Sequence, residues 1–128
     1  MCRTGLYHFD MNVNDQQIKE ILEKYKRFTV LGLSADGTKP SQKVPLYMAS
    51  QGYQPVGVNP GHQEIAGMRV YNQLSDVPYE FREFVDVFRK AEQIPMVIDE
   101  ILKVGGVKVV WLQLGIVATA RILAFLNG

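Results

Sequence analysis

Short runs of β-branched and aromatic residues alternate along this chain with segments in which apolar residues recur every three or four positions. Such runs are typical of strands buried on both faces, and the periodic segments are typical of helices that bury one face. The runs cover residues 28–31, 53–58, 67–71, 84–88 and 107–112. Their alternation with helices predicts an α/β fold: a Rossmann-like, doubly wound parallel sheet of about five strands with helices on both faces.

Four segments have the signals of helices. The first starts at an N-cap pattern in residues 14–17 and runs for about three turns. The second begins near Ser41, and the third runs from Pro95 to Gly105. A last helix is expected at residues 118–126. The core-facing residues are expected to be Val44, Leu46, Tyr47 and Met48 in the second helix and Ile98, Ile101 and Leu102 in the third.

The length, composition and charge of the chain indicate how many domains it forms and which partners it disfavours. With 128 residues, of which 47% are hydrophobic and 21% charged, the chain is expected to form one domain, residues 1–128, around a single core. Its formal net charge of +1 provides no general attraction to nucleic acid or to an anionic membrane. No apolar run approaches the ~20 residues of a membrane span, no signal peptide is recognisable and Cys2 is the single cysteine, so we expect a cytoplasmic protein.

The turn after the first strand is the first candidate for chemistry. Its spacing, Gly32-x-Ser34-x-x-Gly37, matches the Gly-x-Gly-x-x-Gly phosphate loop except for the serine at the second position. Amides of the turn and of the following helix, together with Ser34, Lys39 and Ser41, would form an anion site. Taken alone, the motif also fits an ordinary strand-to-helix turn that needs glycine for a positive φ.

The ends of the later strands narrow the choice of ligand. Asn59 follows the second strand, at the position where an NAD-binding domain places Asp or Glu to hold the ribose hydroxyls. The missing carboxylate disfavours NAD, although residues 59–61 also suit a plain turn. Arg89 follows the fourth strand and is a candidate to hold a phosphate or stack on adenine, or else a surface charge. Because parallel strands end at one edge of the sheet, these loops and those at Ser34 and Gln113 are predicted to converge on one ligand site.

Four sets of residues occur in the order and approximate spacing of the small bacterial and archaeal CoA-binding proteins. They are Gly32-Leu33-Ser34 with Lys39-Pro40-Ser41, then Val58-Asn59-Pro60, then Val85 to Arg89, then Val110 to Gly115. Over residues 25–116 the chain resembles these proteins, which are similar to the CoA-binding Rossmann domain of the succinyl-CoA synthetase alpha subunit standing alone. Four ordered motifs are far more specific than one glycine loop.

The resemblance implies binding of CoA or an acyl-CoA through its nucleotide part at the carboxyl ends of the strands. It implies a phosphate-facing loop at 32–41, a nucleotide side at 58–60, an adenine or ribose-phosphate side at 88–89 and a far rim near 113–115. The cofactor-binding residues that it implies are Gly32, Leu33, Ser34, Lys39, Pro40, Ser41, Val58, Asn59, Pro60, Phe88, Arg89, Gln113 and Gly115.

The sequence provides no recognisable catalytic set. No Ser-His-Asp or Cys-His group can be argued, and His8 and His62 lack metal-ligand spacing. We therefore expect a ligand-binding module rather than an enzyme, with a small nucleotide ligand and with neither nucleic acid nor membrane as partner. One alternative is an NAD(P)-binding enzyme or redox sensor in which Arg89 or Lys39 takes the 2′-phosphate. Another is an interaction protein that uses its apolar C-terminal helix on a Rossmann scaffold.

The C-terminal residues depart from the family pattern. Family members usually continue after the Gln-Leu-Gly loop through a polar helix into one more strand that carries an Asp-Arg-Cys-like segment. Residues 117–128 are largely apolar and contain neither that cysteine nor a recognisable strand. The sheet is therefore expected to lack the family's last strand.

Overall fold

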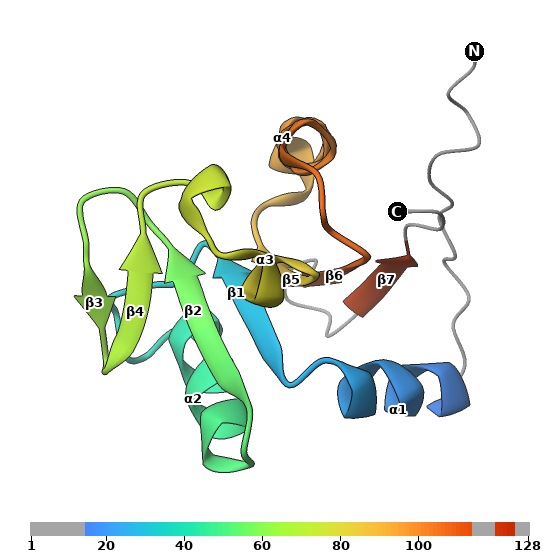
Figure 1. The fold of residues 1–128 in the computed structure, drawn as a ribbon. Coiled ribbons are helices and arrows are strands. Elements are labelled where there is room, and N and C mark those ends of the chain that lie inside the picture. The colour runs from blue at the N-terminus through green and yellow to red at the C-terminus, as the bar shows by residue number, and fades with distance from the viewer. Residues whose placement is uncertain (1–14, 114–119, 125–128) are drawn as a thin grey trace.

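A computed structural model of the chain describes residues 15–113 and 120–124. These residues form one mixed sheet flanked by helices (Figure 1). The strands are β1 (Arg27–Leu31), β2 (Gln54–Val58), β3 (Glu64–Ile65), β4 (Met68–Tyr71), β5 (Phe84–Phe88), β6 (Val109–Gln113) and β7 (Ala120–Ala124). The helices are α1 (Asp15–Lys24), α2 (Pro40–Ser50), α3 (Tyr79–Arg82) and α4 (Ile94–Val104), with short 3₁₀ turns η2 (Leu74–Asp76) and η3 (Ala91–Gln93).

The strand order β3-β4-β2-β1-β5-β6-β7 confirms the predicted Rossmann-like fold. The five central strands, β4, β2, β1, β5 and β6, pair in parallel, and all five lie where the sequence predicts them. The register sets Leu31 at the end of β1 between Val58 of β2 and Val87 of β5. The order reverses at β1, because the chain builds β2 and β4 on one side of it and β5 and β6 on the other. Ligands of open α/β sheets bind at such a switch point.

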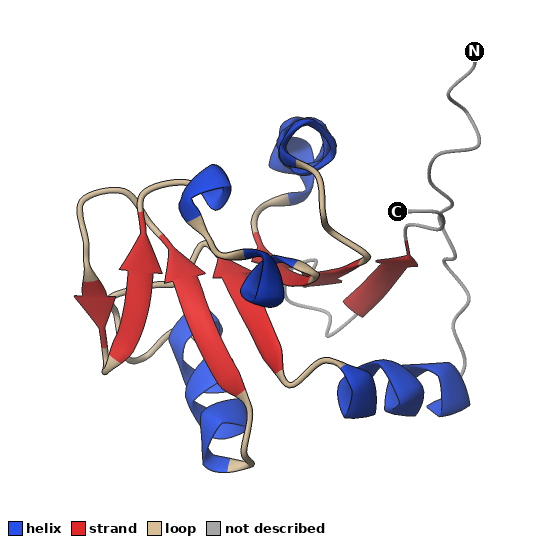
Figure 2. Ribbon diagram, in the orientation of Figure 1, coloured by secondary structure: helices blue, strands red, loops and turns tan. Residues whose placement is uncertain are grey.

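Helices cover both faces of the sheet, and each face has its own apolar core (Figure 2). Val85 and Val87 of β5 pack on the side of α3 and α4, together with Ile101. Phe84, the neighbour of Val85 in the same strand, packs on the side of α1 and α2, together with Ile21. Because successive strand residues point to opposite faces, each apolar run contributes side chains to both cores.

The helix positions are predicted more accurately than the helix faces. In α4, Ile101 is buried and Ile98 half-buried as expected, but the prediction for Leu102 is wrong because its side chain is 39% exposed. In α2, Val44 and Met48 are half-buried, but the predictions for Leu46 and Tyr47 are wrong because both side chains are exposed. The residues that α2 buries are Ser41, Gln42 and Pro45, which share one face at helical spacing.

The predicted helix at 118–126 is wrong. Within that range, β7 pairs antiparallel with β6, from Gln113 beside Ala120 to Val109 beside Ala124. The outer edge of β6 offers unpaired backbone groups, and pairing with them outweighs the helix propensity of an Ala- and Leu-rich segment. The expectation of a sheet that stops at β6 is therefore also wrong. Residues 118, 119, 125 and 126 of the predicted helix lie outside the described part of the chain.

The short strand β3 was not predicted from the sequence. It forms an antiparallel hairpin with β4, in which Ile65 lies beside Met68. The two turn residues between them, Ala66 and Gly67, have φ values of 52° and 85°. This is the backbone of a two-residue hairpin turn, and Gly67 is the only signal for it in the sequence.

One side-chain contact joins the loop after β1 to the neighbouring strand. Leu33 is fully buried and packs directly on Gly57, the last residue but one of β2. A Cβ atom at position 57 would overlap the Leu33 side chain and would lie 2.9 Å from the Leu33 Cβ. Glycine in this strand thus leaves room for the residue that anchors the loop.

Replacing Gly57 with alanine should destabilise the protein by about 1–3 kcal/mol, because the new methyl group overpacks the core against Leu33. Urea unfolding followed by circular dichroism measures the change in unfolding free energy. In a Leu33→Ala background the same substitution should cost less, since most of the overlapping side chain is gone. An equal cost in both backgrounds would contradict this account.

Candidate functional site

The turn after β1 lies directly against the end of β5. Gly32 has a φ of +92°, and a Cβ atom there would lie 2.5 Å from the carbonyl oxygen of Phe88 and 3.5 Å from Nε of Arg89. The Gly32 amide also donates a hydrogen bond to the Val58 carbonyl of β2 at 3.3 Å. Both the positive φ and the close approach require glycine. The turn is therefore fixed at the point where β1, β2 and β5 end.

Asn59 connects the second loop to the first. Its side-chain amide donates to the carbonyl oxygen of Leu33 at 2.8 Å, and its backbone N–H donates to the Tyr71 carbonyl at the end of β4 at 3.0 Å. Asn59 is half-buried. It therefore holds the loops after β1, β2 and β4 together, a structural role that the sequence analysis did not foresee.

The loop between β1 and α2 is organised by Asp36. One carboxylate oxygen, Oδ1, accepts hydrogen bonds from the Thr38 hydroxyl at 2.7 Å and from the Thr38 backbone N–H at 2.9 Å. The Asp36 N–H donates to Oγ of Ser34 at 3.0 Å, which leaves the Ser34 hydroxyl proton available to another acceptor. The Thr38 hydroxyl, then the Thr38 amide, and more weakly the charge of Lys39, lower the pKa of the exposed Asp36 carboxyl.

Asp36 was not among the site residues predicted from the sequence. The signal was nevertheless available, because an Asp side chain commonly binds the backbone N–H two residues further on.

The start of α2 completes this side of the site. Pro40 is the first helical residue and Lys39 the exposed N-cap, and the first turn contains no acidic residue. The Gln42 side chain donates to the Ser34 carbonyl at 2.9 Å, so the loop is tied to the helix end behind it. A helix N-terminus carries partial positive charge, which favours an anion. In α2 this charge counts for more than free amides, because Pro40 has no N–H and the Gln42 N–H donates to the Lys39 carbonyl at 3.0 Å.

The structure brings most of the predicted site residues to the carboxyl edge of the sheet. The loops described above, or the residues beside them, contain 32–34, 39–41, 58–60 and 88–89. Gln113 is the last residue of β6 and pairs with Phe88 of β5. Leu33 and Val58 are buried and Ser41 is 8% exposed, so their side chains are core rather than surface. Gly115 lies outside the described residues. The predicted side chains with exposed or half-exposed surface are Ser34, Lys39, Pro40, Asn59, Pro60, Phe88 and Arg89.

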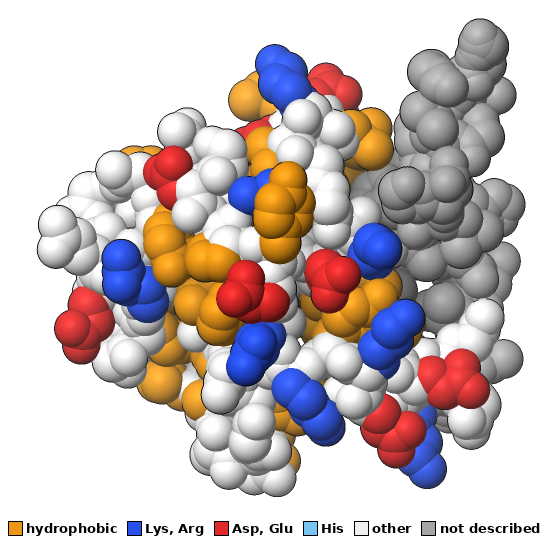
Figure 3. Space-filling view, viewed as in Figure 1, with side chains coloured by type: hydrophobic (Ala, Val, Ile, Leu, Met, Phe, Trp, Pro, Cys, Tyr) orange, Lys and Arg blue, Asp and Glu red, His pale blue; other side chains and the backbone are white. Residues whose placement is uncertain are grey.

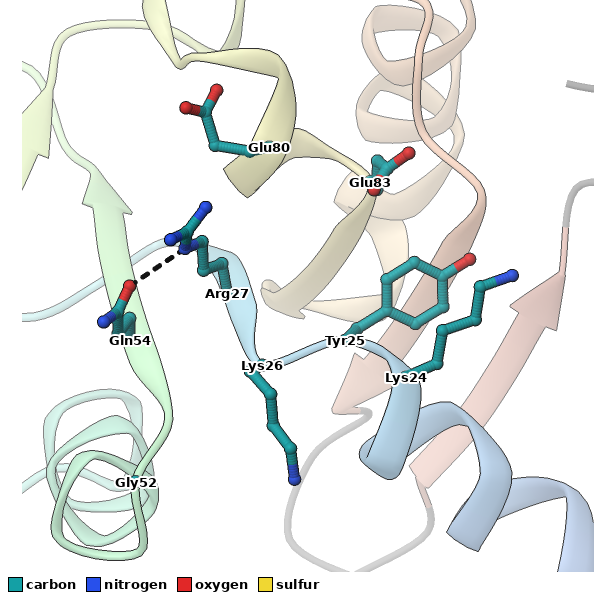
Figure 4. A pocket seen from close by; sticks show the side chains of 8 residues that line it. All are labelled: Lys24, Tyr25, Lys26, Arg27, Gly52, Gln54, Glu80 and Glu83. Carbon is teal, nitrogen blue, oxygen red and sulfur yellow. Dashed lines mark hydrogen bonds between the residues drawn. The ribbon is translucent and has the colours of Figure 1, made fainter.

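A charged cavity of about 390 Å³ lies at the opposite, amino edge of the sheet (Figure 4). Arg27 of β1 and the carboxylates of Glu80 and Glu83 face it, and Nε of Arg27 donates to Oε1 of Gln54 at 3.0 Å. Charges of both signs are likewise interspersed on the face seen in Figure 3. Mixed charges give no clear preference for an anion, so this cavity does not compete with the carboxyl-edge loops as a phosphate site.

Within residues 15–113 and 120–124, His, Cys, Asp and Glu side chains do not gather in a group of three that could hold a metal ion. None of the helices in these same segments is long and apolar enough to cross a membrane.

Comparisons with known proteins match most of the chain. Residues 26–127 match a family described as a CoA binding domain. The uncharacterized protein YneT of Bacillus subtilis (strain 168) is 36% identical over 106 residues, which are 83% of this chain and 77% of YneT. A hypothetical protein from Pyrococcus horikoshii OT3 has a similar structure, with a TM-score of 0.71 and 31% identity over 87% of this chain and 75% of its own. A protein from Thermus thermophilus has a TM-score of 0.62 and 32% identity over 72% of this chain and 69% of its own.

Replacing Asp36 with alanine should lower the protection of the Thr38 amide against hydrogen exchange by about two- to tenfold, as expected when one net hydrogen bond is lost. Asp36→Asn is the matched control, because an amide oxygen can still accept both bonds. Exchange is measured by NMR and corrected for the intrinsic rate. Equal protection in both variants would show that Asp36 does not order the loop.

The protection should also depend on pH in a defined direction. The folded-state pKa of Asp36 is depressed below its ordinary value of 3.8, so the stabilisation that it provides is complete above that value. It should be lost only as the pH falls through the depressed pKa. The same exchange measurement at pH 7, 5 and 3 should therefore show a constant protection factor that drops at the lowest pH; a drop between pH 7 and 5 would contradict the assignment.

Proposed function

The chain belongs to the family of CoA binding domains, and from this premise we propose that it binds CoA or an acyl-CoA through the nucleotide part at the carboxyl ends of β1, β2, β5 and β6. The observation that supports this location is the contact of the Gly32 turn with Phe88 and Arg89. This contact sets a glycine turn beside an arginine at the switch point of the sheet, and the hydrogen bond from Gln42 to the Ser34 carbonyl ties the start of α2 to the same loop. Such an arrangement suits the phosphates of a nucleotide.

The loop between β1 and α2 is assigned to the phosphates. The Ser34 hydroxyl proton is available because its oxygen already accepts the Asp36 N–H. Lys39 adds an exposed positive charge at the N-cap of α2. Charge-assisted hydrogen bonds from such groups to phosphate oxygens are among the stronger ones in proteins.

The loops after β2 and β5 are assigned to the base and the ribose. Arg89 and the half-exposed ring of Phe88 offer a planar cation and an aromatic face for adenine. Pro60 and Asn59 line the other side. No carboxylate stands at the end of β2, and the Asn59 amide is already bonded to Leu33, so the usual contact to an NAD ribose is not provided there.

Calorimetric titration of the purified protein with CoA, acetyl-CoA, ADP, NAD and NADP at one salt concentration tests this proposal. CoA is expected to bind with micromolar affinity and NAD far more weakly. A preference for NAD or NADP would favour the redox alternative instead. Binding of none of the five would contradict a nucleotide site altogether.

Replacing Lys39 with alanine should weaken CoA binding by about 1–3 kcal/mol, the value of one charged hydrogen bond. Folding should be unaffected, because Lys39 is exposed. Lys103→Ala is the matched control, since it removes the same charge from the exposed C-terminal turn of α4. Equal affinities for CoA in the two variants would remove Lys39 from the site.

A further inference from the structure

A second cavity, of about 320 Å³, lies on the face of the sheet that α1 and α2 cover. Its walls come from Leu22 of α1, Val44 and Met48 of α2, Phe84 of β5 and Trp111 of β6. None of the loops assigned to the nucleotide lines it. It is therefore a separate feature of the fold.

Most of the side chains that line this cavity are hydrocarbon or aromatic, and two polar ones, Gln51 and the buried Asp86, also line it. Phe84 and Trp111 form an aromatic pair with ring centroids 6.4 Å apart, and Phe84 is only 2% exposed. Tyr53 also lines the cavity, but its hydroxyl already donates to the Leu22 carbonyl at 2.9 Å. The tyrosine therefore contributes its ring. Such a lining favours an apolar ligand, because a polar one would lose its hydrogen bonds to water.

The dimensions of the cavity suit an aliphatic chain better than a protein partner. It follows α2 from Val44 to Gln51, a rise of about 10 Å. Its volume is at the lower end of the range for small-molecule sites, roughly 300–1,000 Å³. A stable protein partner would instead need a patch of about 800 Å² on each side.

We propose that this cavity binds an aliphatic chain of short to medium length. The chain can come from two sources, the acyl group of an acyl-CoA or a free fatty acid. Val44 follows the first residue of α2 by about 6 Å along the helix axis, so the cavity begins one turn below the loop assigned to the phosphates. For the acyl-CoA source, the inference rests on the proposed function.

Titration of the full chain with CoA, butyryl-CoA, octanoyl-CoA and octanoate tests the inference and separates the two sources. If the bound aliphatic group is the acyl group of an acyl-CoA, octanoyl-CoA should bind more tightly than butyryl-CoA, by up to about fourfold for each additional buried methylene. If it is a free fatty acid, octanoate should bind equally well with and without CoA. Failure of CoA itself to bind would contradict the nucleotide site, whereas octanoate binding would still support the cavity.

Val44→Phe fills the cavity and should abolish the gain from the longer acyl chain, or the binding of octanoate, while leaving the affinity for CoA unchanged. Leu46→Phe is the matched control on the same helix, because Leu46 is 37% exposed and does not line the cavity. If Val44→Phe does not fold, Met48→Phe fills the same space. Equal affinities for CoA and both acyl-CoAs without octanoate binding, or a gain that persists in the filled variant, would overturn the inference.

Discussion

The approach of Gly32 to the carbonyl oxygen of Phe88 is the contact on which the arrangement of the candidate site depends. It brings the end of β1 to the end of β5 at a distance that a Cβ atom would not permit without displacement. From this point the chain continues into Leu33, which packs on Gly57, and into the loop that Asp36 orders. Gly32 in the turn after β1 and Gly57 in β2 thus allow the loop to pack closely against the ends of β5 and β2.

Much of this arrangement could be predicted from the sequence. Parallel strands buried on both faces leave long apolar runs, and the loops that follow them must share one edge, so the convergence of residues around Ser34, Asn59 and Arg89 was predictable. The contacts that fix these loops were not. The bond from Asn59 to Leu33 and the packing of Leu33 on Gly57 join residues more than twenty positions apart, and no local pattern encodes them.

Two wrong predictions, the buried face of α2 and the conformation of residues 120–124, also result from long-range contacts. The apolar periodicity of α2 fits more than one helix phase, and the phase in which Pro45 is buried leaves Tyr47 66% exposed. The segment that forms β7 has residues that favour a helix, but its conformation is decided by the free edge of β6. In both cases a tertiary contact overrides a local preference. The glycine turn and the helix start next to it needed no such contact to be recognised.

The most direct test of the central claim is to map CoA on the protein by ¹⁵N–¹H NMR. If the nucleotide binds at the carboxyl edge, the largest shifts should fall on the amides of residues 32–41, 59 and 88–90. The amides that line the amino-edge cavity, among them Arg27 and Gln54, should remain unchanged. Shifts concentrated at the amino edge, or no shifts at saturating CoA, would contradict the account.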